Sequence, residues 1–359
     1  MLWCKTVQIP RRSIMLMTEE KTKKIRERWK TEGRYPYCGY RLTEPFNTRE
    51  DMSVNLSVII VSWNCKTELL NCLHSLTDQN SGDSIEILVV DNASSDGSVE
   101  AVRLHFPSVH IIQTGTNLGF AQAANRGLTA ARGEYVLFLN PDTLVQTCVL
   151  RPALHTLQRW PTVGILGVQL LNSDGSVQPS CGQFLSLPAL VRENICYFSG
   201  HWSQNSEGKE KHLWSSTTIE EPDWIIGAFL LCRRTVLQEV GGFDKEYFLY
   251  AEDMDLCYRV RQRGYKILYF PEVTVTHHGN RSGAQKWAEQ REGEIVRAEI
   301  LFLHKHNGKL SAFGFRLLAG SLFFAKSFMF WLQARKHQEW YRVEARRYWY
   351  MGQVCFGIK

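Results

Sequence analysis

The sequence lacks most of the patterns that assign a chain to a class directly. Its ten cysteines form no Cys-x-x-Cys pair and no regular spacing, which argues against a disulfide framework or zinc site and predicts reduced thiols. It has no Gly-x-Gly-x-x-Gly motif and no Walker A loop, so a nicotinamide or P-loop site is not indicated. Residues 1–16 lack a sustained apolar core and a small-residue cleavage site, so we expect a cytoplasmic chain.

Positive charge is scarce in the middle of the chain and concentrated at its ends. Basic and acidic residues number 12 and 7 over residues 1–52, 22 and 27 over 53–309, and 8 and 2 over 310–359. Basic ends predict contact with an anionic partner, either membrane lipid or nucleic acid. We expect no nucleic acid, because the basic residues lie outside the predicted folded body and no nucleic-acid motif is present.

Hydrophobic patterning divides the chain into an extension, a folded body and a tail. Residues 1–52 show no strand pattern beyond a charged helix at 18–30, and we expect them to be partly ordered or disordered. From Leu56, apolar runs alternate with helical stretches: strands are predicted at 56–63, 85–92, 109–114 and 134–140, and helices at 66–79, 98–106 and 119–131. This alternation predicts an α/β domain over 53–309, with a mostly parallel central sheet flanked by helices.

The second half of this domain is more irregular. A strand is predicted at 162–171, an irregular loop at 180–221, and a strand broken by Gly227 at 223–234. Residues 243–265 begin irregularly and become a helix, and 266–279 predict a strand, a Pro-Glu turn and a second short strand.

Polar side chains follow the strands of this predicted sheet where functional groups of α/β proteins gather, at the carboxyl ends. They are Trp63, Asn64, Asp91, Asn92, Asn117 and Asp142, and Asn125 is expected near the same edge. Each acid also has a structural explanation: Asp91 could cap the next turn, and Asp142 in Asn-Pro-Asp-Thr could form an Asx-turn. The residues alone leave both alternatives open.

Further acids begin a helix, and two histidines end the last strand. Glu252 and Asp253 could serve a site or only favour the helix dipole, whereas Asp255 is expected to face away and to cap or pair with Arg259 at i+4. Since neighbouring residues of a strand face opposite sides, only one of the two histidines can face the carboxylates. Such a mixture of imidazole and carboxylate suits Mg²⁺ or Mn²⁺ better than zinc.

Seven segments together resemble one known family. In chain order they are LSVIIVSWN, EILVVDNASSDGS, TNLGFAQAANRG, LFLNPDT, WIIGAFLLCRR, GGFDKEYFLYAEDMDLCYR and VTHHGNRSG. Over about residues 56–305 they resemble the family 2 inverting glycosyltransferases of the GT-A fold, most closely the rhamnosyltransferase-like branch. The motifs are specific to the family and not to the sugar.

The resemblance implies a role for each matching residue. Asp253 would be the general base and Glu252 would position it or the acceptor. Asp142 and His277 would hold a divalent cation, Mg²⁺ or Mn²⁺, with Asn140 in place of a first acid. Asp91 would bind the base of the nucleotide. Further substrate contacts are expected from Ser62, Trp63, Asn64, Asn92, Asn117, Gly119, Asn125, Asn140, Gly227 and Ala228.

The implied function is transfer of a sugar from a nucleotide diphosphate to a saccharide or lipid-linked saccharide in cell-envelope polysaccharide synthesis. The first donor to test is dTDP-L-rhamnose. An N-acetylhexosamine or galactofuranose nucleotide and a non-catalytic sugar-nucleotide-binding protein are the alternatives.

The tail over residues 310–359 predicts helices. Residues 310–332 are apolar and aromatic, but Arg316 and Lys326 interrupt them, so a transmembrane span is a poor prediction. The aromatic and basic residues up to 350 instead predict peripheral contact with an anionic membrane, at the inner face of the cell membrane. A packed terminal helix or a homodimer contact is the alternative.

Overall fold

The computed structural model describes residues 56–77, 85–146, 149–187, 213–279, 291–334 and 339–358. The predicted extension over 1–52, including its helix at 18–30, and most of the predicted loop over 180–221 lie outside these ranges. The described residues all belong to one compact unit, Arg49–Lys359.

The first half alternates strands and helices as the apolar pattern predicts. Strands β1 and β4 are buried along their whole length and β2 over its last four residues, because helices cover both faces of the sheet. The elements are β1 (Leu56–Ser62), α2 (Lys66–Thr77), β2 (Ile85–Asp91), α3 (Ser98–His105), β3 (His110–Gln113), α4 (Gly119–Ala130) and β4 (Tyr135–Leu139).

The second half contains elements that the sequence did not predict, namely the helix α5 and the short strands β5, β7, β8 and β9, of which β8 and β9 lie within the predicted loop over 180–221. The elements are β5 (Thr143–Val145), α5 (Leu150–Arg159), β6 (Val163–Leu171), β7 (Val177–Gln178), β8 (Cys181–Gly182), β9 (Leu213–Trp214), β10 (Trp224–Ile225), β11 (Phe229–Arg233), α7 (Arg234–Val240), α8 (Glu252–Gln262) and β12 (Lys266–His277). The expected break at Gly227 separates β10 from β11.

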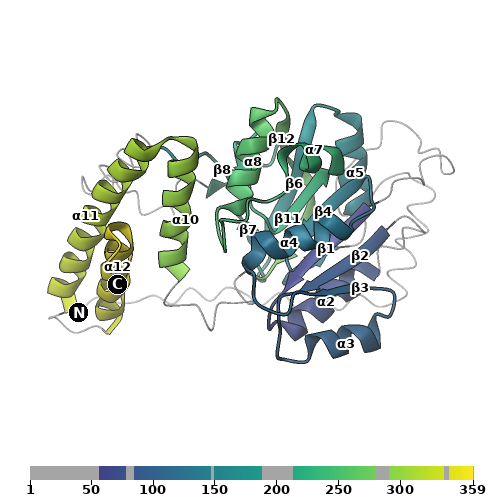
Figure 1. Ribbon diagram of the computed structural model, residues 1–359, viewed down its shortest axis with the longest axis horizontal. Coiled ribbons are helices and arrows are strands. Elements are labelled where there is room, and N and C mark those ends of the chain that lie inside the picture. The colour runs from purple at the N-terminus through teal and green to yellow at the C-terminus, as the bar shows by residue number, and fades with distance from the viewer. Residues whose placement is uncertain are drawn as a thin grey trace, which may run out of the picture. The chain divides into compact units, whose positions relative to one another are not determined.

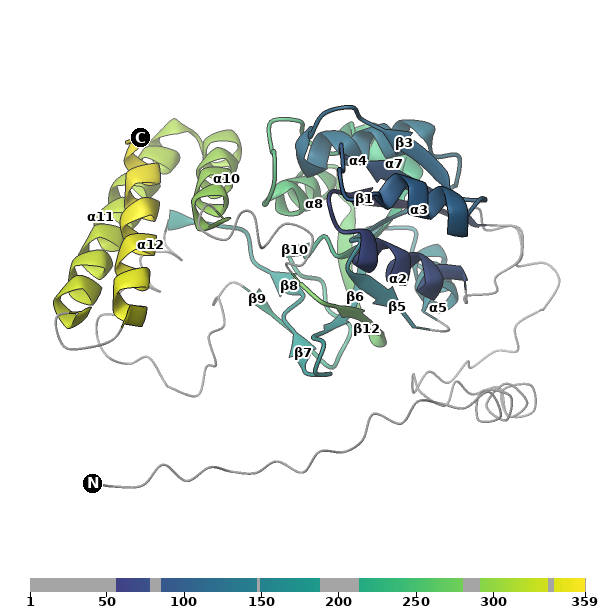
Figure 2. The same ribbon diagram turned by 90° about the horizontal axis from the view of Figure 1, so that it is seen from below.

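The central sheet is mixed, with mostly parallel strands (Figure 1). Its strand order is β3-β2-β1-β4-β11-β6-β12-β5, and β7 pairs with β6. Strands β11 and β5 run antiparallel to their neighbours, and the other strands of this order run in one direction. Helices α4, α7 and α8 cover one face and α2, α3 and α5 cover the other (Figures 1 and 2), which is the arrangement expected of right-handed crossovers.

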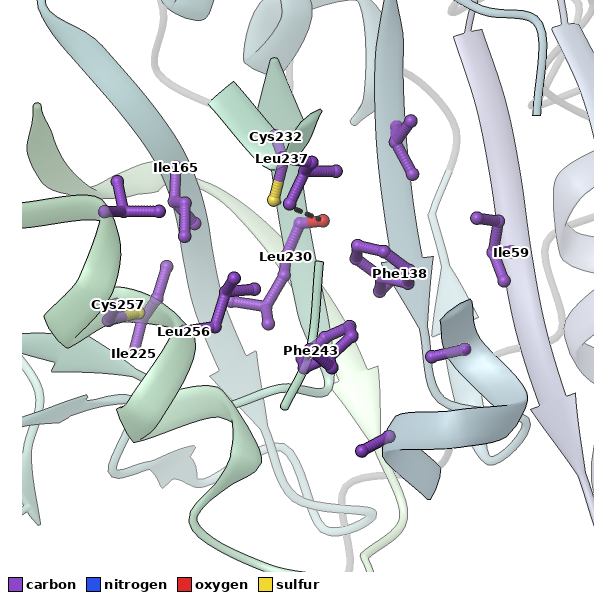
Figure 3. Packing of buried hydrophobic residues seen from close by; sticks show 14 of the residues in the cluster. Ile59, Phe138, Ile165, Ile225, Leu230, Cys232, Leu237, Phe243, Leu256 and Cys257 are labelled. Carbon is purple, nitrogen blue, oxygen red and sulfur yellow. Dashed lines mark hydrogen bonds between the residues drawn. The ribbon is translucent and has the colours of Figure 1, made fainter. Parts of the chain in front are cut away.

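The core lies between the sheet and the α4, α7 and α8 layer. Figure 3 shows Ile59 of β1, Phe138 of β4 and Leu230 of β11 meeting side chains from the helices. Phe243, from the loop after α7, packs edge-on against Phe138 with ring centroids 4.8 Å apart. The loop that leads to α8 is thereby anchored in the core.

The last strand differs from the prediction. The expected Pro-Glu turn and second strand are wrong, because β12 is a single strand of 12 residues. Its register against β6 shifts between Phe270 and Thr274. Pro271 lies in this bulge, where its missing N–H removes no ladder hydrogen bond.

The chain ends in three helices, α10 (Arg291–His306), α11 (Lys309–Ala334) and α12 (Glu339–Phe356), which lie side by side (Figures 1 and 2). The helical tail is confirmed, and α10 precedes it as a helix that was not predicted. By length and composition alone α11 qualifies as a membrane span, with 28% of its most apolar stretch buried, and one such helix is weak evidence for a span.

Candidate active site

The sheet topology gathers the predicted site residues along one edge. Strands β1, β2, β4 and β12 run in the same direction and end there at Ser62, Asp91, Leu139 and His277. Strand β11 runs the opposite way, so Gly227 and Ala228, just before it, lie at the same edge.

The side chain of Asn92 shapes the loop that follows β3. It is 3% exposed, and its amide nitrogen donates to Asn117 Oδ1 at 2.9 Å and to the carbonyl of Gly119 at 3.1 Å. Its oxygen accepts from the backbone N–H of Leu118 at 2.9 Å and from the Thr114 hydroxyl at 3.2 Å. Both Asn92 and Asn117 were predicted to contact the substrate. In the structure, the amide groups named here hold the loop in place.

Gly119 connects this loop to the segment that precedes α8. Its φ is +77°, and a Cβ there would lie 2.3 Å from the carbonyl oxygen of Phe248. The next backbone N–H, that of Phe120, donates to the same carbonyl at 2.8 Å. Only glycine permits this approach, so the residue sets the spacing between two loops of the site.

Backbone strain marks the segments around the edge. The non-glycine residues with positive φ are Asn64 (49°), Ala93 (65°), Tyr250 (71°) and Ala251 (59°) in the described chain. Asn64 and Ala93 follow β1 and β2, and the other two immediately precede α8. The Asn64 oxygen also accepts from the backbone N–H of Ser95 at 2.8 Å. Such strain collects at functional sites, where the surrounding structure holds it.

Asn125 lies farther along α4 and is fully engaged with the backbone. Its amide nitrogen donates to the carbonyl of Phe243 at 2.7 Å, and its oxygen accepts from the N–H of the same residue at 2.9 Å. These two bonds show that Asn125 anchors the loop before α8, and its contact with the substrate stays a prediction.

Asp91 keeps one carboxylate oxygen available. The side chain is 3% exposed, and Oδ2 accepts from the backbone N–H of Ser94 at 3.2 Å. Oδ1 is buried and has no hydrogen-bond partner among the described residues. A buried acceptor of this kind calls for a donor. Nearby, Ser62 is buried with its hydroxyl 3.3 Å from Cys65 Sγ, and Trp63 is half-buried.

Asp142 and His277 converge, although 134 residues separate them in the chain. Strand β5 pairs with the end of β12, and this places Asp142 Oδ1 3.4 Å from His277 Nε2. Asn140 Nδ2 lies 3.3 Å from the same nitrogen. Two ligands at right angles around a cation at about 2.1 Å would be about 3.0 Å apart, so the observed pair is close to that spacing.

Gln178 of β7 sets the orientation of the imidazole, and sequence reasoning missed it. Its side-chain oxygen lies 2.9 Å from His277 Nδ1. The amide oxygen can only accept, so Nδ1 donates to it, and this contact turns Nε2 toward Asp142. A two-residue strand gives no sequence signal that could have identified Gln178.

The neighbouring histidine and thiols do not join this pair. His278 Nδ1 lies 2.7 Å from the Ser173 hydroxyl, which confirms that only one histidine faces the carboxylates. Burial raises the pKa of Cys65 to about 11 and raises the pKa of Cys72 further, so both remain thiols at neutral pH. Every described cysteine is buried and free, as expected of reduced thiols.

The first turn of α8 presents two adjacent carboxyl groups. Burial, with the charge of Asp253 second, raises the pKa of Glu252 to about 8, and Glu252 Oε2 is buried without a hydrogen-bond partner among the described residues. Burial also raises the pKa of Asp253, but backbone N–H groups of Gly227 and Met254 donate to its two oxygens, each at 2.8 Å. These bonds favour the charged form, so Glu252 holds the proton and Asp253 the charge.

Backbone contacts link this pair to the Asp142 side of the site. Asn140 N–H donates to the carbonyl of Ala228 at 3.1 Å, and the adjacent Gly227 holds Asp253. A Cβ on Gly227 would lie 3.3 Å from Asp253 Oδ2. The predicted residues Gly227 and Ala228 thus connect the two halves of the site through their backbone.

Comparisons with known proteins identify the family of the chain. The family model described as glycosyl transferase family 2 matches residues 57–241. The chain is 32% identical to an N-acetylglucosaminyl-diphospho-decaprenol L-rhamnosyltransferase of Mycobacterium tuberculosis, over 62% of this chain and 76% of that protein. It is 26% identical to the rhamnosyltransferase WbbL of Escherichia coli, over 63% of this chain and 85% of that protein.

Among solved structures, the mannosyltransferase PcManGT of Pyrobaculum calidifontis, in complex with GDP-Man and Mn²⁺, aligns with a TM-score of 0.48. The two are 19% identical, over 88% of this chain and 89% of that one.

The chain belongs to glycosyl transferase family 2. The predicted family and enzyme class are therefore confirmed, and the protein is a glycosyltransferase.

Proposed function

We propose that this glycosyltransferase moves a sugar, with inversion, from a nucleotide diphosphate to a saccharide or lipid-linked saccharide of the cell envelope. The acceptor hydroxyl oxygen forms the new bond to the anomeric carbon, the bond from that carbon to the diphosphate oxygen breaks, and the acceptor proton passes to Asp253. The observation that carries this proposal is the first turn of α8, where Asp253 is held charged beside a protonated Glu252.

Asp253 is suited to act as the general base. Its two backbone hydrogen bonds leave further lone pairs on both oxygens, and its raised pKa makes it a stronger base than a solvated aspartate. Glu252, protonated at neutral pH, would donate a hydrogen bond and so position the acceptor without a competing charge.

The donor is proposed to lie along the edge from Asp91 to His277. The available Asp91 Oδ1 would accept an N–H of the nucleotide base. Because the relatives named above are rhamnosyltransferases, dTDP-L-rhamnose is the first donor to test. Nucleotides of an N-acetylhexosamine or of galactofuranose are the other candidates.

Asp142 and His277 form a donor pair that suits a divalent cation, Mg²⁺ or Mn²⁺. Such an ion supplies charge stabilisation for the departing diphosphate. Asp142 and His277 would hold it, and Gln178 would keep the imidazole oriented with Nε2 toward the ion. No cluster of three His, Cys, Asp or Glu side chains with metal-site spacing occurs in the described part of the chain, so the phosphates and water would complete the coordination.

The location proposed is the inner face of the cell membrane. Aromatic side chains are exposed along α11 and α12, among them Phe313, Phe328, Trp331, Trp340 and Trp349. Amphipathic surfaces rich in aromatic and basic residues lie in the membrane interface. This supports contact of residues 310–350 with the membrane, and a homodimer through the same surface is the alternative.

A donor screen tests the proposal. Binding of dTDP-, UDP- and GDP-sugars to the purified chain would be measured by calorimetry with Mg²⁺, with Mn²⁺ and with EDTA, and slow donor hydrolysis would be followed by release of the nucleotide diphosphate. We expect cation-dependent binding of one donor, dTDP-L-rhamnose first. The absence of binding to any donor would favour a non-catalytic scaffold.

Asp142→Ala tests the cation pair. We expect the variant to lose about tenfold or more in donor affinity with Mn²⁺ and to match the wild type in EDTA, because only the ion-mediated contact is removed. The control is Glu221→Gln, which changes a half-exposed carboxylate paired with Lys266. Unchanged cation dependence in Asp142→Ala would contradict the assignment.

A further inference from the structure

A cavity of about 570 Å³ lies among the C-terminal helices, and no residue of the proposed catalytic site lines it. Its floor is apolar and includes Ile300, Ala312 and Val354. Four basic or imidazole groups line it as well, namely Arg297, His304, Lys309 and Arg316. The described lining residues include no carboxylate. An apolar floor beneath cationic groups suits an anion that carries a hydrocarbon chain.

The basic groups keep donors available for such an anion. Arg316 Nη1 donates to the carbonyl of Cys355 at 3.1 Å, which uses one of the five N–H groups of the guanidinium. Arg297 pairs with Glu294 and lies 3.4 Å from the Tyr350 hydroxyl. Lys309 begins α11, where the positive end of a helix of 26 residues adds to its charge.

An apolar path leads away from the cavity along α11. Phe313, which lines the cavity, is 59% exposed, and Leu310 and Leu317 are 87% and 45% exposed. Positions three and four apart share one face of a helix, so these side chains form a stripe, which Phe328 and Trp331 continue toward the end of the helix. A lipid chain could therefore lie on this stripe while its head occupies the cavity.

The helices that form the cavity also contact the helix that carries the proposed base. Ile300 and Ala312 of the cavity belong to one buried cluster with Met254, the residue next to Asp253. Partly buried Ala251, directly before Glu252, packs against the same cluster. A ligand bound in the cavity is therefore connected to the first turn of α8 through this cluster of buried side chains.

We propose that this cavity holds the phosphate or diphosphate head of the acceptor's lipid anchor, with the hydrocarbon chain along Leu310, Phe313 and Leu317. The inference rests on the proposed function in one respect, namely that the acceptor is lipid-linked. It commits to an isoprenoid-type phosphate lipid as the occupant and not to bulk phospholipid or free phosphate.

The test compares probes that carry one or both parts of this ligand. Binding of farnesyl diphosphate, farnesol and inorganic pyrophosphate to the full chain would be measured by calorimetry. We expect farnesyl diphosphate to bind at least about tenfold more tightly than either of the other two, because only it uses both the floor and the cationic rim. Pyrophosphate that binds as tightly as farnesyl diphosphate would overturn the lipid assignment.

Matched variants locate the site. Lys309→Ala/Arg316→Gln should weaken farnesyl diphosphate at least about tenfold, and Lys309→Ala alone, at an exposed residue, should weaken it by a smaller factor. Arg342→Gln/Arg346→Gln removes two exposed charges of α12 outside the cavity and should leave this affinity within about twofold. Equal losses in the two double variants would show diffuse charge attraction and overturn the proposal.

Two further measurements separate this inference from others. In Lys309→Ala/Arg316→Gln, flotation with phosphatidylglycerol–phosphatidylcholine vesicles should fall by a smaller factor than farnesyl diphosphate binding, because the exposed aromatic and basic residues of α12 remain; a loss of flotation with farnesyl diphosphate binding intact would identify a surface for membrane headgroups and overturn the proposal. Nucleotide-sugar binding should also be unchanged. Donor binding without farnesyl diphosphate binding overturns only the cavity, whereas the absence of donor binding overturns the proposed function.

Discussion

The first turn of α8 carries buried acids on two faces, and the fold gives these acids different partners on each face. On the face toward the site, Asp253 accepts from the backbone N–H groups of Gly227 and Met254, each at 2.8 Å, and burial raises its pKa. On the face toward α10, Asp255 is fully buried, but it accepts from Arg259 Nε at 2.7 Å and lies 2.7 Å from His306 Nε2. The residues are neighbours on one helix, so the difference lies in the partners that the fold supplies.

The contrast separates an acid that stabilises the fold from acids kept for chemistry. The expected pairing of Asp255 with Arg259 at i+4 is confirmed, and the added contact with His306 fixes α10 against α8. A buried acid without such partners costs stability, and it persists where its shifted pKa is useful. Under the proposed function, the site face is the reactive one, and the α10 face is its support.

The largest effect is expected where the reactive face loses its base. Asp253→Asn keeps the size of the side chain and removes the proton acceptor, so we expect transfer to fall by about 10²–10⁴-fold. Donor affinity should stay within about twofold, because the donor is proposed to lie along the edge from Asp91 to His277. Initial rates of transfer and calorimetry of donor binding measure the two quantities.

The matched control for this variant is Glu246→Gln, at a carboxylate that is 60% exposed in the loop before α8. It should retain full transfer. Normal turnover in Asp253→Asn would remove the distinction between the two faces of the helix.

The supporting face predicts a loss of stability without a change in chemistry. Asp255→Asn leaves the partly buried Arg259 and His306 without their carboxylate, so the free energy of unfolding should fall by about 3 kcal/mol. Urea unfolding followed by circular dichroism measures this. The exposed pair Glu221–Lys266 gives the comparison, because Glu221→Gln should cost less than about 1 kcal/mol. Equal losses of unfolding free energy in the two variants would show that the burial of Asp255 adds nothing to the stabilisation from its ion pair.

The sequence predicted elements where local pattern decides them and missed elements that depend on distant partners. Continuous apolar runs sufficed for β1, β2 and β4. Strand β5 has three residues, and it exists because β12, more than 120 residues later, pairs with it. The sequence predicted a Pro-Glu turn within β12, because the local pattern does not show that a continuous strand can accommodate Pro271. The bulge that accommodates it depends on neighbouring strands.

The candidate site was predictable to the same extent. Motif order placed Asp142 and His277 at one edge, and their contact at 3.4 Å agrees with that placement. The asparagine side chains were harder to predict, because tertiary contacts decide whether an asparagine faces the substrate or the backbone. Asn125, for example, holds the backbone of Phe243. Gln178 was missed for the same reason.

The smallest expected effect is a pH dependence that belongs to Glu252 alone. Its folded-state pKa, about 8, lies above the ordinary value near 4.3, so the folded chain binds more protons than the unfolded chain between these values. Stability must then fall as pH rises through this window, by about 2 kcal/mol between pH 6 and 8. Glu252→Gln cannot ionise, so its free energy of unfolding should change less over the same range, and the two curves should converge toward acid pH.

Urea titrations at pH 5, 6, 7 and 8 measure the difference, with Glu221→Gln as the control that keeps the wild-type slope. Parallel curves for the wild type and Glu252→Gln would mean that Glu252 is charged at neutral pH, and the proton would then have to be placed on Asp253, which could no longer act as the base.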